Sequence, residues 1–442
     1  MKDLSTGRGT ATATSAVPVE LPQLRTVSPP PAEDGDDEGL RQPRALRPRL
    51  QHLVLAAAAV WLVTRVGLAV FTYAEVGLGT SNPGQFHSFL SAWQQYDTRW
   101  YLLISRVGYN QAPASAFFPL YPAVVGLVAA LLGDAHGPVW PAFDPVRLGV
   151  ALGVANLFSL AGFVGLALLA HQESRDERTG IQAVWALAAY PYAFFLAAAY
   201  SEGPFVAAAA FTLYFARRGS WGWAALSGVA ASLIRPTGIA LALPLAWEYG
   251  RQHDWGRSLA LQPWRPRLKT VLGGVAVVAA VPLAVAGYAV FLWQRFGTPL
   301  IWFKVQADVW DRRTNAPWST AVSLAERLID FPAWSRDRAH LLVTVVPFAV
   351  LLLVLVVAWR RMPFSFVLYT LAVFYLAISA PIVSSAELIE SAGRLIIPAL
   401  PVFLILGTWM SRRPGFAQAW LAVGFLAQAA LLVSFFQHHW VA

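Results

Sequence analysis

About eleven apolar stretches, separated by short basic segments, constrain this chain more than any other feature of its sequence. Several reach the ~20 residues that a helix needs to cross the ~30 Å hydrocarbon core of a bilayer. Lipid offers no hydrogen-bond partners, so the backbone N–H and C=O groups of an unbroken apolar stretch must bond to one another there, which a helix achieves. The sequence therefore predicts an all-α membrane protein with spans at 52–74, 146–170, 181–199, 203–216, 221–234, 236–249, 270–295, 339–359, 363–383, 394–410 and 416–438.

Basic segments between the spans predict the topology, because Lys and Arg are enriched in cytoplasmic loops. If the chain begins in the cytoplasm, five of them fall on the same side: Arg175/Arg178, Arg217/Arg218, 251–269, Arg360/Arg361 and Arg412/Arg413. This agreement requires 115–132 not to cross the membrane, and 221–249 to form a tight hairpin bent at "RPTG". We therefore expect a multi-pass protein of the cell membrane with a cytoplasmic N-terminus, and the net charge of +9 needs no nucleic-acid partner.

Residues 1–50 differ from the rest of the chain in composition. They contain the acidic, Pro/Gly-rich run "PPPAEDGDDEG" and four arginines just before the first span. Such a segment cannot bury a core, so we predict a disordered cytoplasmic tail at 1–50 and a membrane-embedded domain at 51–442. The first apolar run begins near residue 52 and is long enough to span, which does not match a cleavable signal. The chain has no cysteine, which excludes disulfides and thiolate metal sites.

Four polar features fall on the extracytoplasmic side of this topology. They are the first outer loop at 75–145 with Asp97, the turn "AYSEG" with Glu202, the loop 297–338, and "ELIESAGRLIIP" with Arg394. Polar groups clustered at one side of an apolar bundle indicate an active site or the mouth of a translocation path. The bend at Arg235 should face the same cavity, because irregular backbone at membrane depth requires one.

Asp97 lies in an aromatic stretch, "WQQYDTRWYLLISRVGY", whose apolar residues recur every three or four positions. That spacing predicts a helix lying in the membrane interface. In one interpretation Asp97 caps this helix by accepting hydrogen bonds from its first N–H groups. In the other, Asp97 is a general base for a sugar or lipid hydroxyl, and Tyr96, Trp100 and Tyr101 form aromatic walls around the acceptor.

Glu202 and Arg235 are charged residues between apolar runs, where an isolated charge is costly. Glu202 either caps the next helix or lines a polar cavity together with Tyr200. Arg235 either binds phosphate through its planar fork or serves as a structural partner for Glu202 or for freed carbonyl groups.

Arg394 and Lys304 are two further candidate phosphate contacts. Arg394 opens an apolar run, so it either binds phosphate or extends to the interface as a snorkelling side chain. Lys304, in "PLIWFKVQADVWDRR", binds phosphate or is a solvated loop residue.

Metal ligation has little support in the sequence. Asp308 and Asp311 can share a helix face. The adjacent Arg312 and Arg313 favour salt bridges instead, so we predict no metal site.

Five sequence segments occur in a fixed order: "WQQYDTRWYLLISRVGY", "AFFPLYP", "YSE", "RPTG" and "GRLIIPALPVF". In this order they resemble the PIG-V-type mannosyltransferases of the GT-C superfamily, which include the eukaryotic GPI mannosyltransferase 2 and shorter bacterial relatives. The resemblance runs from about residue 52 to residue 410. One departure is that Tyr96 precedes the first-loop acid, where many members of the family have Trp.

The resemblance implies a GT-C fold, a multi-span helical bundle with the first outer loop over the active site. It implies an inverting enzyme that takes mannose from a polyprenyl-phosphate donor, and it makes Asp97 the counterpart of the essential first-loop acid. Phosphate roles for Arg235 and Arg394 remain our own inference. The acceptor would be a hydroxyl of a glycolipid, a lipid glycan or a protein. No metal or other cofactor is expected, because a lipid monophosphate lacks the diphosphate that usually needs one.

Two other classes of protein fit the same bundle. A transporter or lipid flippase would carry polar residues along a whole transmembrane path, whereas here they gather on one side. A non-catalytic assembly partner would keep the bundle but tolerate the loss of Asp97.

Overall fold

A computed structural model describes residues 48–78, 88–134, 137, 142–255, 264–382, 385 and 388–437. The expected tail at 1–50 lies outside the described residues except at its end, where the first helix begins. The described residues are predominantly helical, and their β-structure is one isolated bridge between Arg312 and Ile382. The predicted all-α class is therefore confirmed for this part of the chain.

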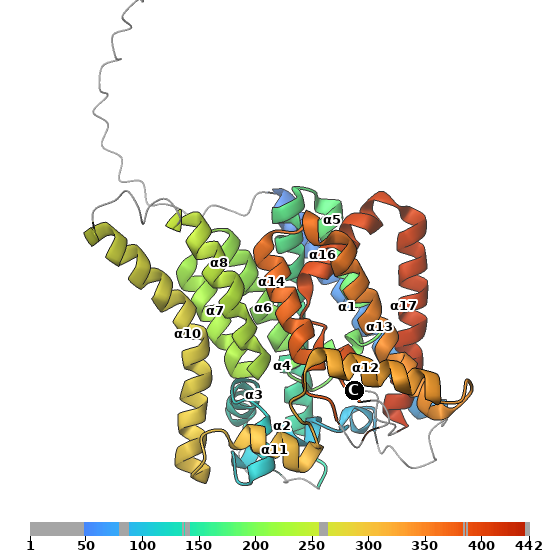
Figure 1. Ribbon diagram of the computed structural model, residues 1–442. Coiled ribbons are helices and arrows are strands. Elements are labelled where there is room, and N and C mark those ends of the chain that lie inside the picture. Colours follow the sequence, from blue (N-terminus) through green and yellow to red (C-terminus); the bar gives the residue numbers. More distant parts are fainter. Residues whose placement is uncertain are drawn as a thin grey trace, which may run out of the picture. The chain divides into compact units, whose positions relative to one another are not determined.

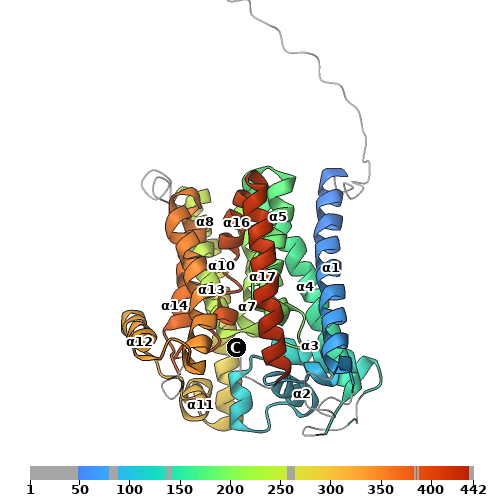
Figure 2. The ribbon, with the colours of Figure 1, turned by 90° about the vertical axis from the view of Figure 1, so that its right-hand side faces the viewer.

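Within the described residues, five helices are long and apolar enough to cross a membrane. They are α1 (Pro48–Leu78), α4 (Pro145–Ser174), α10 (Trp264–Phe296), α13 (Arg336–Ala358) and α17 (Pro414–Phe436). They coincide with five predicted spans, and the side-on views show them running along the bundle (Figures 1 and 2). Many of their apolar side chains are exposed, as lipid-facing side chains are.

Shorter helices fill the rest of the bundle: α5 (Glu177–Ala188), α6 (Glu202–Arg217), α7 (Trp221–Ile234), α8 (Ala242–Gln252), α14 (Phe364–Ile378) and α16 (Leu400–Arg412). Four are shorter than predicted, because prolines exclude continued helix. The run 236–249 starts as a 3-10 turn at Pro236 and becomes α-helical only at Ala242. The run 181–199 stops being α-helical before Pro191, 363–383 ends before Pro381, and 394–410 becomes a regular span only at Leu400. The irregular backbone at these places is buried and carries the polar residues of interest.

Close helix contacts in the bundle depend on glycine. A Cβ added to Gly203 on α6 would lie 2.6 Å from the Ala155 carbonyl oxygen of α4. One added to Gly407 on α16 would lie 2.5 Å from the Ala183 backbone nitrogen of α5. Small residues at these crossings let the backbones approach, as in membrane helix pairs generally.

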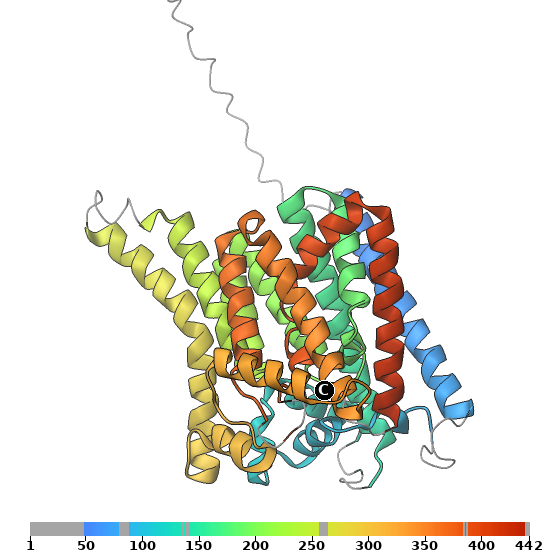
Figure 3. The ribbon, with the colours of Figure 1, turned by 45° about the vertical axis from the view of Figure 1, so that its right-hand side comes forward.

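The two ends of the bundle differ in character. Four short helices lie at one end: α2 (Thr98–Val107), α3 (Leu120–Leu131), α11 (Ile301–Trp310) and α12 (Pro317–Asp330). The turns with the paired arginines lie at the other end (Figures 1 and 3). As expected, α3 lies across this end rather than along the bundle. The hairpin also forms, with α7 and α8 joined by the 3-10 turn η4 (Pro236–Leu241). Which end faces the cytoplasm remains a prediction.

The predicted first-loop helix starts directly after Asp97, as expected, but the aromatic residues before Asp97 are not part of it. Trp93 closes a separate 3-10 turn (Ser91–Trp93), and Tyr96 has a left-handed φ of 44°, so α2 starts only at Thr98. Tyr101 is buried and packs edge-on against Phe117 and Tyr121, with centroid distances of 5.2 and 4.9 Å. This ring therefore packs inside the protein.

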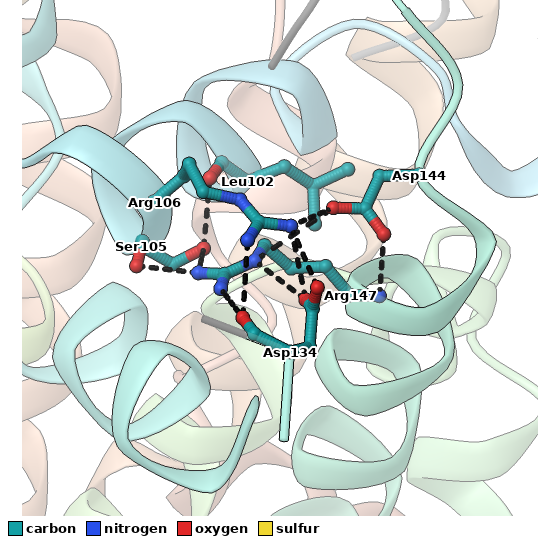
Figure 4. A network of polar contacts seen from close by, with 6 residues as sticks. All are labelled: Leu102, Ser105, Arg106, Asp134, Asp144 and Arg147. Atoms are coloured by element: carbon teal, nitrogen blue, oxygen red, sulfur yellow. Dashed lines mark hydrogen bonds and ion pairs between the residues drawn. The ribbon is translucent and has the colours of Figure 1, made fainter. Parts of the chain in front are cut away.

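Four charged side chains fasten the first loop to the bundle (Figure 4). Arg106 at the end of α2 binds Asp134 at 3.0 Å and also binds Asp144. Arg147 on α4 binds Asp134 at 3.1 Å and donates to the Ser105 carbonyl at 2.5 Å. Asp144 caps α4 by accepting from the Arg147 backbone N–H at 2.9 Å. This network, the loop clamp, joins α2, the end of α3 and the start of α4.

Candidate functional site

Asp97 immediately precedes α2, but it does not cap that helix. Its backbone is already helical and its carboxylate accepts no hydrogen bond from the N–H groups of α2. Instead, its Oδ2 accepts a hydrogen bond from Arg394 Nη1 at 2.8 Å, across 297 positions of sequence. The capping interpretation is therefore wrong.

Arg394 lies in the short helix α15 (Ala392–Leu395), between α14 and α16. Its side chain is only 9 % exposed, which excludes the snorkelling interpretation. Besides Asp97, its Nε lies 3.3 Å from Oε1 of Glu202. Its guanidinium carbon lies 5.3 Å from the ring centroids of both Phe195 and Tyr200, in cation–π contact.

Glu202 is the first residue of α6, and its side chain is 1 % exposed. Its Oε1 binds Arg235, which lies at the bend between α7 and η4. Its Oε2 has no hydrogen-bond partner among the described residues. Glu202 thus joins Arg235 to Arg394, and Arg235 is a structural partner of Glu202, as one of the two interpretations expects. Its phosphate role stays a prediction.

These contacts form an alternating series, Asp97–Arg394–Glu202–Arg235, which we call the charge cluster. Two acids balance two arginines, which reduces the large cost of burying charge. The four residues come from four separate segments, and each lies where prolines or turns interrupt a helix. The sites predicted separately along the sequence therefore meet in one place.

Tyrosines hold the backbone beside Asp97. The Tyr200 hydroxyl accepts from the Asp97 N–H at 3.3 Å and donates to the Gln95 carbonyl at 3.2 Å. The Tyr101 hydroxyl donates to Ser201 Oγ at 2.9 Å. Acceptor-binding roles for these rings remain predictions.

Tyr96 and Trp100 are the other two first-loop aromatic residues predicted to surround the acceptor. The Tyr96 ring packs 5.6 Å from Phe435, and Trp100 stacks on Phe117 at 5.7 Å. The Tyr96 contact holds the first loop against α17, whereas the Trp100 contact is made within the first loop. Their proposed roles as walls of an acceptor site remain predictions.

Arg65, which the sequence reasoning did not select, supports the irregular segment next to the charge cluster. From the middle of α1 it donates to Asn156 Oδ1 at 2.7 Å, to Ser159 Oγ at 2.6 Å and to the Leu196 carbonyl at 3.3 Å. Asn156 in turn donates to the Ala197 carbonyl at 2.8 Å. The buried backbone carbonyl groups of the non-helical segment between α5 and α6 thus gain hydrogen-bond partners, which buried polar groups require.

The loop 297–335 places its cations differently from the sequence expectation. Lys304 lies on α11 with an exposed side chain. Arg313 pairs with Asp311 at 3.2 Å, as expected. Arg312 instead turns inward and donates to the Glu390 carbonyl at 3.2 Å and to Ser391 Oγ at 3.1 Å. The predicted salt bridge is therefore wrong for Arg312, which extended backbone directs away from its neighbour.

An apolar groove of about 480 Å³ lies between α3, α4, α6 and α7. Trp223 and Leu226 on its wall are more than half exposed, so the groove reaches the side surface of the bundle. Pro204 and Ile234 also line it; Pro204 is two residues from Glu202, and Ile234 directly precedes Arg235. The groove thus leads from the surface toward the charge cluster.

Fold and site together define a helical membrane protein with a buried charge cluster at one end and an apolar groove beside it. No family model and no curated protein matches the chain. Among solved structures it is similar to the Archaeoglobus fulgidus oligosaccharyltransferase in its apo form, with 12 % identity, a TM-score of 0.44, and coverage of 87 % of this chain and 56 % of that one.

Two further structures from Archaeoglobus fulgidus are similar at 12 % identity. One is the same enzyme tethered to an acceptor peptide with the NVT sequon, with a TM-score of 0.43 and coverage of 87 % and 55 %. The other is the archaeal oligosaccharyltransferase AglB with an inhibitory peptide and a dolichol-phosphate, with a TM-score of 0.41 and coverage of 87 % and 56 %. The chain spans about half the length of these proteins.

Proposed function

We propose that this protein is a GT-C-type inverting glycosyltransferase that transfers mannose from a polyprenyl-phosphate donor to an extracytoplasmic hydroxyl. The acceptor would belong to a glycolipid, a lipid glycan or a protein. The observation that carries the proposal is the buried charge cluster at the inner end of an apolar groove. A lipid-linked substrate needs both features, an apolar path for its chain and fixed charges for its reacting end.

Asp97 has the position required of a general base. Arg394 binds Oδ2 and fixes the carboxylate, whereas Oδ1 makes no hydrogen bond to the described residues and is free to accept a proton. The side chain is 14 % exposed, so a substrate hydroxyl can reach it. The acceptor proton would pass to Asp97 as the acceptor oxygen attacks the anomeric carbon.

The leaving group takes the electron pair of the bond between the anomeric carbon and the phosphate oxygen. A phosphodiester with one negative charge thereby becomes a phosphate monoester with two. Arginines held in a low-dielectric site stabilise that added charge more in the transition state than in the ground state. The donor supplies the driving force, so the scheme needs no metal and no nucleotide.

The assignment of mannose as the sugar and of a polyprenyl phosphate as its carrier rests on sequence resemblance. The first-loop segment and the four segments that follow it resemble the PIG-V-type enzymes. The alternative of a transporter or flippase has less support, because the charge cluster lies at one end of the bundle. A non-catalytic assembly partner would not need Oδ1 of Asp97 to be accessible.

The test uses membranes that contain the full chain and radiolabelled polyprenyl-phosphate mannose. We expect Asp97→Asn to reduce transfer by about 10²- to 10⁴-fold, because proton abstraction is lost. Asp308→Asn, which changes an exposed acid on α11, is the matched control and should transfer at the wild-type rate. Full transfer by Asp97→Asn would show that Asp97 is not the base. No transfer by wild type with any acceptor class would favour the other two functions.

A further inference from the structure

Three arginines lie close to Asp97, and they differ in how their charge is compensated. Arg394 binds the carboxylates of Asp97 and Glu202, and Arg235 binds that of Glu202. Arg312, from the connection between α11 and α12, has no carboxylate of a described residue within ion-pair distance. Its guanidinium is bound only to neutral oxygen atoms, the Glu390 carbonyl and Ser391 Oγ.

The surroundings of Arg312 make its uncompensated charge unfavourable. Burial and, next, the positive charge of Arg394 lower the pKa of Arg312 to about 10, although Asp97 and Glu390 act in the opposite direction. The Glu390 carboxylate is itself bound by Ser385 Oγ. An anion that enters the site would therefore gain most from Arg312.

The geometry of Arg312 also leaves donors for such an anion. Both of its hydrogen bonds come from Nη2, and neither Nε nor Nη1 donates to a described residue. Adjacent N–H groups of one guanidinium match two oxygens of a phosphate. The backbone on either side is fixed by a left-handed Asp311 with φ of 48° and by the bridge from Arg312 to Ile382.

We infer that Arg312 is the residue that binds the phosphate of the lipid-linked donor. Arg235 and Arg394 then hold the carboxylates of the charge cluster in place. The inference rests on the proposed function, and it changes the phosphate contacts expected from sequence. Arg312 lies in a connection separate from the segments that carry Asp97 and Glu202, so phosphate binding and proton abstraction are assigned to different parts of the chain.

The experiment measures binding alone, on the purified full chain in lipid nanodiscs. The probes are a polyprenyl monophosphate and the polyprenol of the same length, which lacks the charge. Variants Arg312→Gln and Arg312→Lys are compared with Arg313→Gln, which changes the neighbouring, exposed arginine. Thermal unfolding without ligand confirms that each variant is folded.

We expect Arg312→Gln to weaken binding of the phosphate by about ten- to a hundredfold, the effect of losing charge-assisted hydrogen bonds. Polyprenol binding should be unchanged. Arg312→Lys should fall in between, because it keeps the charge but not the fork, and Arg313→Gln should bind as wild type does.

Unchanged phosphate affinity in Arg312→Gln would overturn the inference, and so would an equal loss in Arg313→Gln. Either result leaves the proposed transfer reaction intact, since that reaction is tested separately by the Asp97 variant. A wild-type protein that binds phosphate and polyprenol equally would also overturn the inference.

Discussion

At the scale of single residues, Glu202 is the one on which the charge cluster depends. It lies between Arg235 and Arg394 and is almost completely buried. Removing one partner from a buried ion pair leaves an uncompensated charge, which costs more than the pair contributed. Glu202 is therefore expected to be a stability residue as well as a site residue.

We expect Glu202→Gln to lower the free energy of unfolding by about 3–5 kcal/mol, because two arginines lose their shared carboxylate. Chemical denaturation in detergent micelles measures the change. The double variant Glu202→Gln/Arg235→Gln removes one uncompensated charge along with the acid, so it should recover part of the loss. A double variant less stable than the single one would contradict this view of the pair.

At the scale of elements, the loop clamp determines how the first loop lies on the bundle. It ties α2, the end of α3 and the start of α4 together through side chains that are at most 10 % exposed. Burial alone would raise the pKa of Asp134, but hydrogen bonds and charge from Arg106 and then Arg147 outweigh it and hold that pKa below its usual value. The clamp therefore favours ionised Asp134.

The lowered pKa of Asp134 predicts how the first loop responds to acid. A carboxyl with a lowered pKa in the folded state adds stability above its unfolded pKa of about 3.8 and loses it as pH falls through the lower, folded value. Protection of 98–134 from hydrogen exchange should thus be constant from neutral pH down to about pH 4 and fall below it. Asp134→Asn should show reduced protection already at neutral pH. Equal protection in the variant and the wild type would show that the loop clamp does not stabilise the first loop.

At the scale of the whole molecule, the apolar groove lies beside the segments that carry Glu202 and Arg235. The groove lies between four helices, and its inner end is next to Glu202 and Arg235. Ala230, on α7, lines it with a small side chain.

We expect Ala230→Phe to raise KM for a long-chain polyprenyl-phosphate donor by about tenfold or more, because burial of even a few methylene groups is lost. A donor with a much shorter chain should be affected less, and kcat should change little. Ala325→Phe, on the exposed face of α12, is the control. Equal effects on long and short donors would show that the chain does not lie in the groove.

Much of this architecture can be predicted from sequence, for physical reasons that apply along the whole chain. Arginine pairs identify one end of the bundle, and apolar length identifies the five long helices. If all the basic segments are to lie on the same side of the membrane, 115–132 must lie across the bundle and "RPTG" must bend a hairpin. Each of these predictions needs only local composition and a count of crossings.

The pairings inside the site cannot be predicted in this way. Asp97 and Arg394 meet across 297 positions, and nothing in their own segments indicates that contact. Arg312 was assigned to a salt bridge because acids lie nearby in sequence. In the structure the chain leaves α11 through the left-handed Asp311 and pairs at Arg312 with Ile382, and the local sequence indicates neither feature.

The contact between Arg394 and Asp97 has a consequence for timing. Under the proposed reaction, Asp97 becomes neutral when it takes the acceptor proton, so its attraction for Arg394 falls at that moment. The departing phosphate gains its second negative charge in the same step. The positive charge of Arg394 is therefore least compensated at the moment when the leaving group gains its own charge, so its long-range electrostatic contribution is greatest in the transition state.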